Sequence, residues 1–102
     1  MIDKLKSIVS QYNELAELMS QPDAMKDMKT FTKIAREHSR LTELVEEAKK
    51  YIEIYGQIQE DEEILNGDDA ELKELVKDEI GDLQDSLAAR EKKLKILLIP
   101  KN

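Results

Sequence analysis

The sequence predicts an all-α fold, an antiparallel three-helix bundle in which a long central helix tapers to a two-helix coiled coil. Charged residues make up 38% of the 102 residues and aromatic residues 4%, with 3 glycines and 2 prolines, which is typical of long, ion-paired helices. Apolar residues recur with helical spacing along three segments, and short polar turns between the segments make consecutive helices antiparallel. We expect a single helical domain over residues 1–102, with helices at about 3–20, 24–65 and 69–98.

The first helix is predicted by a single apolar stripe. Its steps of three and four residues place the stripe on one face of a helix. Asp3 lies in the first turn, where the helix dipole favours a negative charge. Pro22 ends the helix because the residue before a proline disfavours the α conformation, so Asp23 is expected to start the next element. The stripe consists of Leu5, Ile8, Tyr12, Leu15 and Met19.

The second helix is predicted by an unbroken heptad seam. Thr30 is a possible cap for a new helix start, so the sequence allows a break near residues 29–30. Gly67 suits a left-handed cap at the C-terminal end of this helix. The seam consists of Ile34, His38, Leu41, Val45, Ala48, Ile52 and Tyr55, and it is widened by Leu44, Tyr51 and Ile58.

The third helix begins after a turn, where Asp68 and Glu71 resemble a capping box. Gly81 lies in its interior, where glycine costs about 1 kcal/mol relative to alanine. We therefore expect a close helix crossing at Gly81. The apolar stripe of this helix consists of Val76, Ile80, Leu83, Leu87, Leu94 and Leu97, with Arg90 as the polar member of the series.

The net charge of −7 is unevenly distributed along the chain. Residues 1–50 carry 9 basic and 9 acidic side chains, whereas residues 51–102 carry 7 and 14. The segment from Glu60 to Asp85 holds twelve carboxylates and only two lysines, so it repels a phosphate backbone. A protein partner with a basic face suits this segment better, and sequence-specific nucleic-acid binding by the domain is not expected.

Several classes of protein are disfavoured by the composition. Cysteine is absent, which removes disulfides and thiolate metal sites. No apolar run approaches the roughly 18 residues of a membrane span, and the N-terminus lacks the apolar core of a signal peptide. We expect a cytoplasmic protein without a membrane partner.

The sequence predicts no catalytic residue, metal site or cofactor. His38 is the single histidine and lies in the heptad seam, where a structural role is expected. The acidic run at residues 60–63 and 68–69 does not have the ligand spacing of an EF-hand loop. No phosphate-binding glycine loop and no nucleophile–base arrangement is present in the sequence.

The order of these features resembles the N-terminal helical domain of bacterial peptide chain release factor 1. The resemblance rests on "QPDAMKDMKTFTKIAREHSRLTELVEEAKKYIEI" at Gln21–Ile54, on "EDEEILNGDDAELKELVKDEI" at Glu60–Ile80, and on the more specific "LLIPKN" at Leu97–Asn102. His38 stands near a position where the family often has an aromatic residue. In the family the chain continues beyond this tail, so we expect a fragment of a longer multidomain protein.

The resemblance implies a function in translation termination. The full protein would release the nascent peptide at UAA and UAG codons, through a codon-reading motif and a Gly-Gly-Gln loop that this sequence lacks. This domain would dock, as a monomer, at the stalk base and GTPase-associated region of the large ribosomal subunit, with the recycling GTPase release factor as a second partner. We expect the contacts at two bundle ends, formed by Gln21, Asp23, Lys26 and Asp27 and by Glu60, Asp61, Glu62, Glu63, Asp68 and Asp69.

A second interpretation is a free-standing coiled-coil adaptor or oligomerisation module. Heptad seams often pair between chains, so this interpretation predicts a concentration-dependent oligomer. Sedimentation at several concentrations separates the two, because the release factor domain is expected to remain a monomer.

Overall fold

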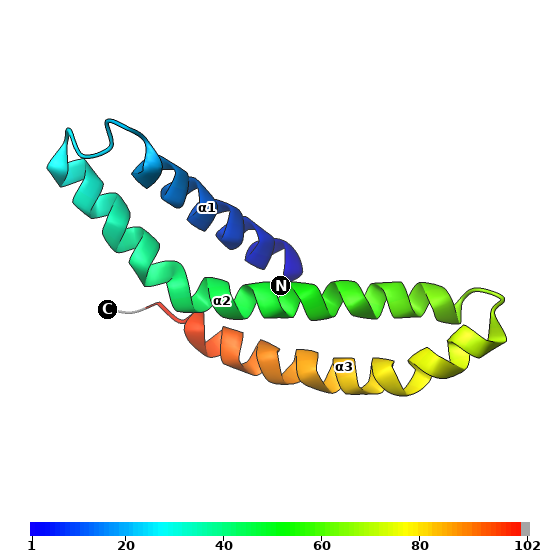
Figure 1. Cartoon of the computed structure of the whole chain (residues 1–102). Coiled ribbons are helices and arrows are strands. Elements are labelled where there is room, and N and C mark those ends of the chain that lie inside the picture. The colour runs from blue at the N-terminus through cyan, green and yellow to red at the C-terminus, as the bar shows by residue number, and fades with distance from the viewer. Residues whose placement is uncertain (101–102) are drawn as a thin grey trace. The chain divides into compact units, whose positions relative to one another are not determined.

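The computed structural model describes residues 1–100, and they form three helices without a strand (Figure 1). The helices are α1 (Ile2–Ser20), α2 (Met28–Leu65) and α3 (Ala70–Leu97). The all-α prediction is therefore confirmed. The chain divides into two compact units, Met1–Ala48 and Lys49–Asn102. Lys101 and Asn102, the end of the "LLIPKN" segment, lie outside the described residues.

The first unit contains α1 and the N-terminal part of α2, which runs in the opposite direction after the turn at residues 21–27 (Figure 1). The predicted stripe of α1 faces inwards: Leu5 is fully buried, and Ile8, Tyr12, Leu15 and Met19 are half-buried. Apolar burial on one face of each helix is the main source of stability in such a pair.

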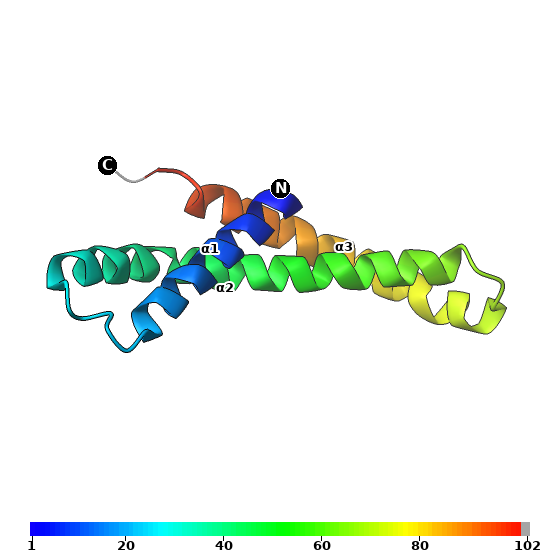
Figure 2. The same ribbon diagram turned by 90° about the horizontal axis from the view of Figure 1, so that it is seen from above.

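The second unit contains the C-terminal part of α2 and α3, which run alongside each other in Figure 1 and cross obliquely in the view of Figure 2. Two pairs of neighbouring residues establish that these helices are antiparallel. Asp61 of α2 lies close to Glu79 of α3, and Tyr51, earlier in α2, lies close to Glu91, later in α3. The buried apolar side chains of this unit come from the predicted seams: Tyr51, Ile58, Val76, Ile80 and Leu94.

The second helix begins at Met28, whereas the sequence suggested residue 24. Asp27 determines this start: its Oδ1 accepts a hydrogen bond from the Thr30 backbone N–H at 3.3 Å, and its Oδ2 accepts one from the Thr30 hydroxyl at 2.7 Å. Asp27 is therefore the N-cap. Thr30 supports this cap, and α2 continues through residues 29–30 without a break.

The turn between α2 and α3 also differs in detail from the prediction. Gly67 does not have a positive φ, so it is not a left-handed cap. Instead, its N–H donates to the Ile64 carbonyl at 3.1 Å, which closes a tight last turn. The N-cap of α3 is Asp69 rather than Asp68, because Asp69 Oδ1 accepts from the N–H groups of Glu71 and Leu72, both at 3.1 Å.

Gly81 does not mark a close helix crossing. A Cβ placed on Gly81 meets no neighbouring atom within 4 Å, so the predicted reason for this glycine is wrong. Replacing Gly81 with alanine is expected to raise the free energy of unfolding by about 1 kcal/mol, because alanine loses less backbone entropy in a helix. Urea denaturation followed by circular dichroism measures this change, and a loss of stability would mean that the site is more crowded than the structure indicates.

Candidate partner-binding surfaces

The turn at residues 21–27 presents its polar side chains to solvent. Gln21, Asp23, Lys26 and Asp27, which the sequence suggested as contact residues, are all exposed. Backbone hydrogen bonds hold the turn in shape: the Ala24 N–H donates to the Gln21 carbonyl at 3.0 Å, and the Lys26 N–H donates to the Asp23 carbonyl at 3.1 Å. Three large apolar side chains on and beside the turn are also exposed, which was not predicted from the sequence: Leu18, Met25 and Met28.

Asp27 has a structural role within this turn. The hydrogen bonds from the Thr30 side chain and backbone N–H lower the pKa of the Asp27 carboxyl, because they stabilise its charged form. Both carboxylate oxygens already accept a hydrogen bond from Thr30. Capping of α2 is therefore a sufficient role for Asp27, and no contact with a binding partner is needed to explain this residue.

The acidic turn, defined here as residues 60–69, is exposed at five of its six predicted contact residues. Asp61 is the exception, with only 2% of its surface accessible. Asp69 is exposed, but its carboxylate caps α3. Just beyond the turn, Leu72 and Leu75 are large apolar side chains on the surface. The exposed carboxylates without such a role are Glu60, Glu62, Glu63 and Asp68.

The cap of α3 leads to a mutational prediction. Replacing Asp69 with alanine is expected to cost about 1 kcal/mol of stability, because two N–H groups in the first turn of the helix lose their acceptor. The matched change Asp68→Ala removes the same charge one residue earlier and is expected to alter stability by less than about 0.5 kcal/mol. Equal effects in urea denaturation would contradict the assignment of Asp69 as the cap.

Asp61 lies on the inner side of the α2–α3 hairpin. Its Oδ1 accepts a hydrogen bond from Gln57 Nε2 at 3.1 Å, while its Oδ2 has no partner among residues 1–100. The carboxyl of Glu79 on α3 lies nearby, and the pKa of Glu79 is raised by desolvation and then by the charge of Asp61. A carboxylate has no proton to donate, so Glu79 and Asp61 can hydrogen-bond each other only when one of the two is protonated.

This pair predicts a pH effect. The folded state raises the pKa of Glu79 above its ordinary value of 4.5. The contribution of Glu79 to the free energy of unfolding is therefore fully present below pH 4.5 and is lost as the pH rises through the raised pKa. As the pH falls from 7 to 4.5, we expect the free energy of unfolding of the Glu79→Gln variant to rise less than that of the unmodified chain. Thermal unfolding across that range tests this, and identical pH profiles would contradict the coupling.

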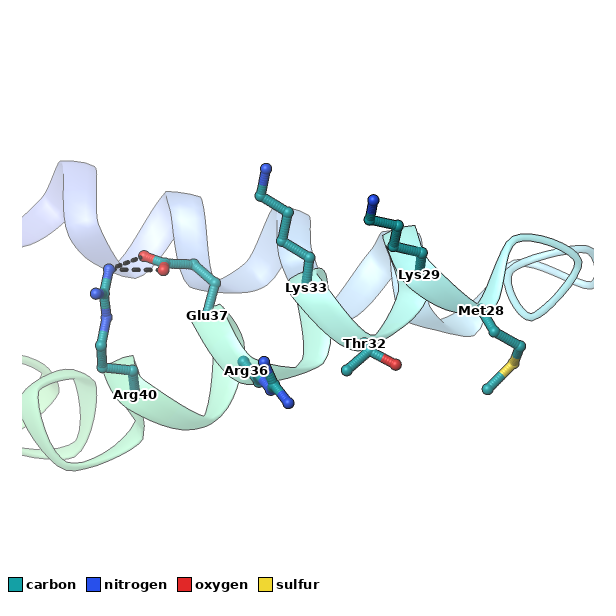
Figure 3. Close-up of a pocket in the computed structure, with 7 residues that line it drawn as sticks. All are labelled: Met28, Lys29, Thr32, Lys33, Arg36, Glu37 and Arg40. Carbon is teal, nitrogen blue, oxygen red and sulfur yellow. Dashed lines mark hydrogen bonds and ion pairs between the residues drawn. The ribbon is translucent and has the colours of Figure 1, made fainter.

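A basic face, defined here as Lys29, Lys33, Arg36 and Arg40, lies on α2 in the first unit. All four side chains are exposed. Together with Met28, Thr32 and Glu37 they line an open hollow, in which Lys29 and Lys33 project in the same direction (Figure 3). Arg40 donates to both carboxylate oxygens of Glu37, at 2.6 and 2.8 Å. This face was not predicted from the sequence, although the steps of four, three and four residues already place its members together.

His38 has the structural role predicted from sequence. Its ring stacks on the ring of Tyr12 in α1, with 4.0 Å between ring centroids and 17° between planes. The Thr42 hydroxyl donates to the His38 carbonyl at 3.2 Å, which leaves the Tyr12 hydroxyl as the donor to Thr42 Oγ1, also at 3.2 Å. These contacts fix α1 against α2 in the first unit.

Residues 1–100 provide no group of three or more His, Cys, Asp and Glu side chains arranged to hold a metal ion. None of the three helices in this part of the chain has a stretch long and apolar enough to cross a bilayer. The described surface therefore offers two turns and one basic face as its candidate binding features.

A family model described as the PCRF domain matches residues 8–102 of the chain. The chain belongs to the PCRF domain family. This PCRF domain is 40% identical, over 102 residues, to peptide chain release factor 1 of Syntrophus aciditrophicus (strain SB), and 42% identical, over 103 residues, to peptide chain release factor 1 of Ligilactobacillus salivarius (strain UCC118).

Each of these alignments covers 100% of the chain, which spans 29% of the length of the relative. The resemblance to the release factor 1 family is thus confirmed along the whole PCRF domain. No solved structure matches the chain significantly.

Proposed function

We propose that this PCRF domain belongs to a translation termination factor and docks that factor on the ribosome. The observation that carries the proposal is the similarity to proteins named peptide chain release factor 1, which extends over the whole chain at about 40% identity. In this proposal the complete factor releases the nascent peptide at UAA and UAG codons in the cytoplasm. The present domain supplies binding and no chemistry.

The proposed docking site is the stalk base and GTPase-associated region of the large subunit. Two surfaces are candidates for the contact: the exposed residues of the turn at 21–27, and the exposed carboxylates of the acidic turn. The acidic turn suits a basic ribosomal protein, because complementary charge accelerates association and excludes wrong partners. The recycling GTPase release factor is a second candidate partner for the same domain.

The expectation that this domain binds the ribosome but does not release peptide rests on the residues present. The 102 residues contain no pair of adjacent glycines and hence no Gly-Gly-Gln sequence. We therefore expect the chain to bind ribosomal large subunits without releasing peptide from stop-programmed ribosomes. Co-sedimentation with purified large subunits and a peptide-release assay test these two expectations. Failure to co-sediment at micromolar subunit concentrations would contradict the docking role.

The acidic turn is tested by a matched pair of variants. The first replaces Glu60, Glu62 and Glu63 with glutamine, and the second replaces the exposed Asp78, Asp82 and Asp85 with asparagine. Both remove three negative charges, but only the first changes the acidic turn. Weaker large-subunit binding by the first variant alone would support the contact, and equal binding by both would remove the acidic turn from the proposal.

We also propose that the isolated domain is a monomer. Sedimentation velocity over a hundredfold range of concentration tests this point. A fraction of dimer that increases with concentration would instead favour the coiled-coil adaptor. The exposed α3 side chains Leu72 and Leu75 would then pair between copies.

A further inference from the structure

The basic face lies on the side of α2 that faces away from α1 in the first unit. At about 100° per residue, Lys29, Lys33, Arg36 and Arg40 fall within an arc of about 60° on the helix. His38, which stacks on Tyr12 of α1, lies about 180° from Lys29 on the same helix. The packed and basic surfaces are therefore on opposite sides of α2, and α1 leaves the basic face open.

Most of the charge on this face is not neutralised within the domain. Arg40 is paired with Glu37, but Lys29, Lys33 and Arg36 have no ion-pair partner within residues 1–100. The first turn of α2 also contains no acidic residue. Lys29 and Lys33 thus lie near the positive end of the helix dipole, where cations are unfavourable. Helix stability does not explain this arrangement, whereas binding of an anion does.

The side chains between the cations indicate which chemical class of anion the basic face can bind. Besides the basic face, the hollow is lined by Met28, Thr32 and the paired Glu37. None of these residues is an aromatic ring that could stack on a base, and the deep, narrow major groove of an RNA duplex prevents the arginines from reading base edges there. The helix carries the cations along a straight line of about 16 Å from Lys29 to Arg40. A rigid row of this kind suits a chain of regularly repeated phosphates.

We propose that the basic face docks on the phosphate backbone of double-stranded RNA without reading its sequence. The proposal deepens the docking function above, since a ribosome offers both RNA and protein, and it assigns the RNA contact to α2. An acidic protein is the competing partner for such a face. The two differ in that an RNA contact releases condensed counterions and is therefore steeply weakened by salt.

The test compares two triple variants with equal charge. One carries Lys29→Gln, Lys33→Gln and Arg36→Gln; the control carries Lys4→Gln, Lys6→Gln and Lys49→Gln, which are exposed lysines away from the basic face. Glutamine is a good helix former, so both variants are expected to keep their helix content by circular dichroism. Binding to a labelled RNA duplex of about 20 base pairs, long enough to extend past the basic face on both sides, is measured by fluorescence anisotropy at 50 and 200 mM salt.

Three phosphate contacts predict a slope of about −2.7 in a plot of log affinity against log salt, equivalent to roughly 40-fold weaker binding at the higher salt. The basic-face variant is expected to lose at least about tenfold in affinity at 50 mM salt and most of this slope, while the control stays within about twofold. Equal losses in both variants, or no RNA binding by the unmodified chain, would overturn the proposal.

Two further outcomes separate this inference from the docking function. If both variants bind large subunits as well as the unmodified chain does, the basic face is not the RNA contact and the docking function stands. If the unmodified chain binds the RNA duplex but not large subunits, the docking function fails and the basic face is still an RNA-binding surface. Binding to an acidic polypeptide, with no RNA binding, would overturn the proposal and identify the competing partner.

Discussion

Replacing Leu94 with alanine is expected to lower the free energy of unfolding by about 3 kcal/mol. Leu94 is one of the largest side chains with no accessible surface in the domain, and it occupies a predicted seam position on α3. Its truncation removes apolar area from the core and leaves a cavity that the surrounding helices fill only in part. Urea denaturation with detection by circular dichroism measures the loss.

The matched control for this prediction lies two residues away on the same helix. Ile96 has 68% of its surface exposed, so Ile96→Ala removes a similar side chain without opening a cavity. We expect it to change stability by less than about 0.5 kcal/mol. A comparable loss of unfolding free energy in the two variants would contradict the complete burial of Leu94.

The contrast between Leu94 and Ile96 illustrates what periodicity can predict. Apolar spacing identified which side of each helix is buried, and Leu5, Val45 and Leu94 all lie in predicted stripes and are enclosed. This works because burial is decided by the helical repeat over many residues. An error at one position does not change the face that the whole stripe defines.

The helix starts were harder to predict because several residues compete for the same role. Asp23 and Asp27 both precede α2, and Asp68 and Asp69 both precede α3. Each can act as an N-cap, and the choice depends on which carboxylate reaches the free N–H groups of the first turn. Thr30 adds a hydroxyl donor to Asp27 and so favours the later start. Composition alone carries no such information.

The candidate surfaces were only partly predictable. Both turns are exposed, apart from Asp61, which was predicted to be solvated like its acidic neighbours. Asp61 follows the seam residue Ile58 by three positions, so the helical repeat places it on the buried face. The basic face was overlooked for a related reason: residues 1–50 have no net charge, and the average conceals four cations gathered on one side of α2.

The buried carboxylate of Asp61 leads to the second large effect that we expect. Asp61→Asn is predicted to raise the free energy of unfolding at pH 7 by about 2 kcal/mol, because an unsatisfied buried charge is removed. An asparagine at this position keeps an acceptor for Gln57, and its amide nitrogen can donate to the carboxylate of Glu79. The same substitution is expected to reduce the dependence of stability on the protonation of Glu79.

Glu62→Gln provides the control, since it removes one negative charge from the same acidic segment at an exposed position. Any general relief of repulsion is common to both variants, and we expect Glu62→Gln to stabilise by less than about 0.5 kcal/mol. The difference between them therefore measures the burial of Asp61. If Asp61→Asn destabilises the domain instead, the Asp61 carboxylate must have a partner in solution that satisfies Oδ2. If it stabilises as expected, the domain carries a buried charge that its own fold does not require.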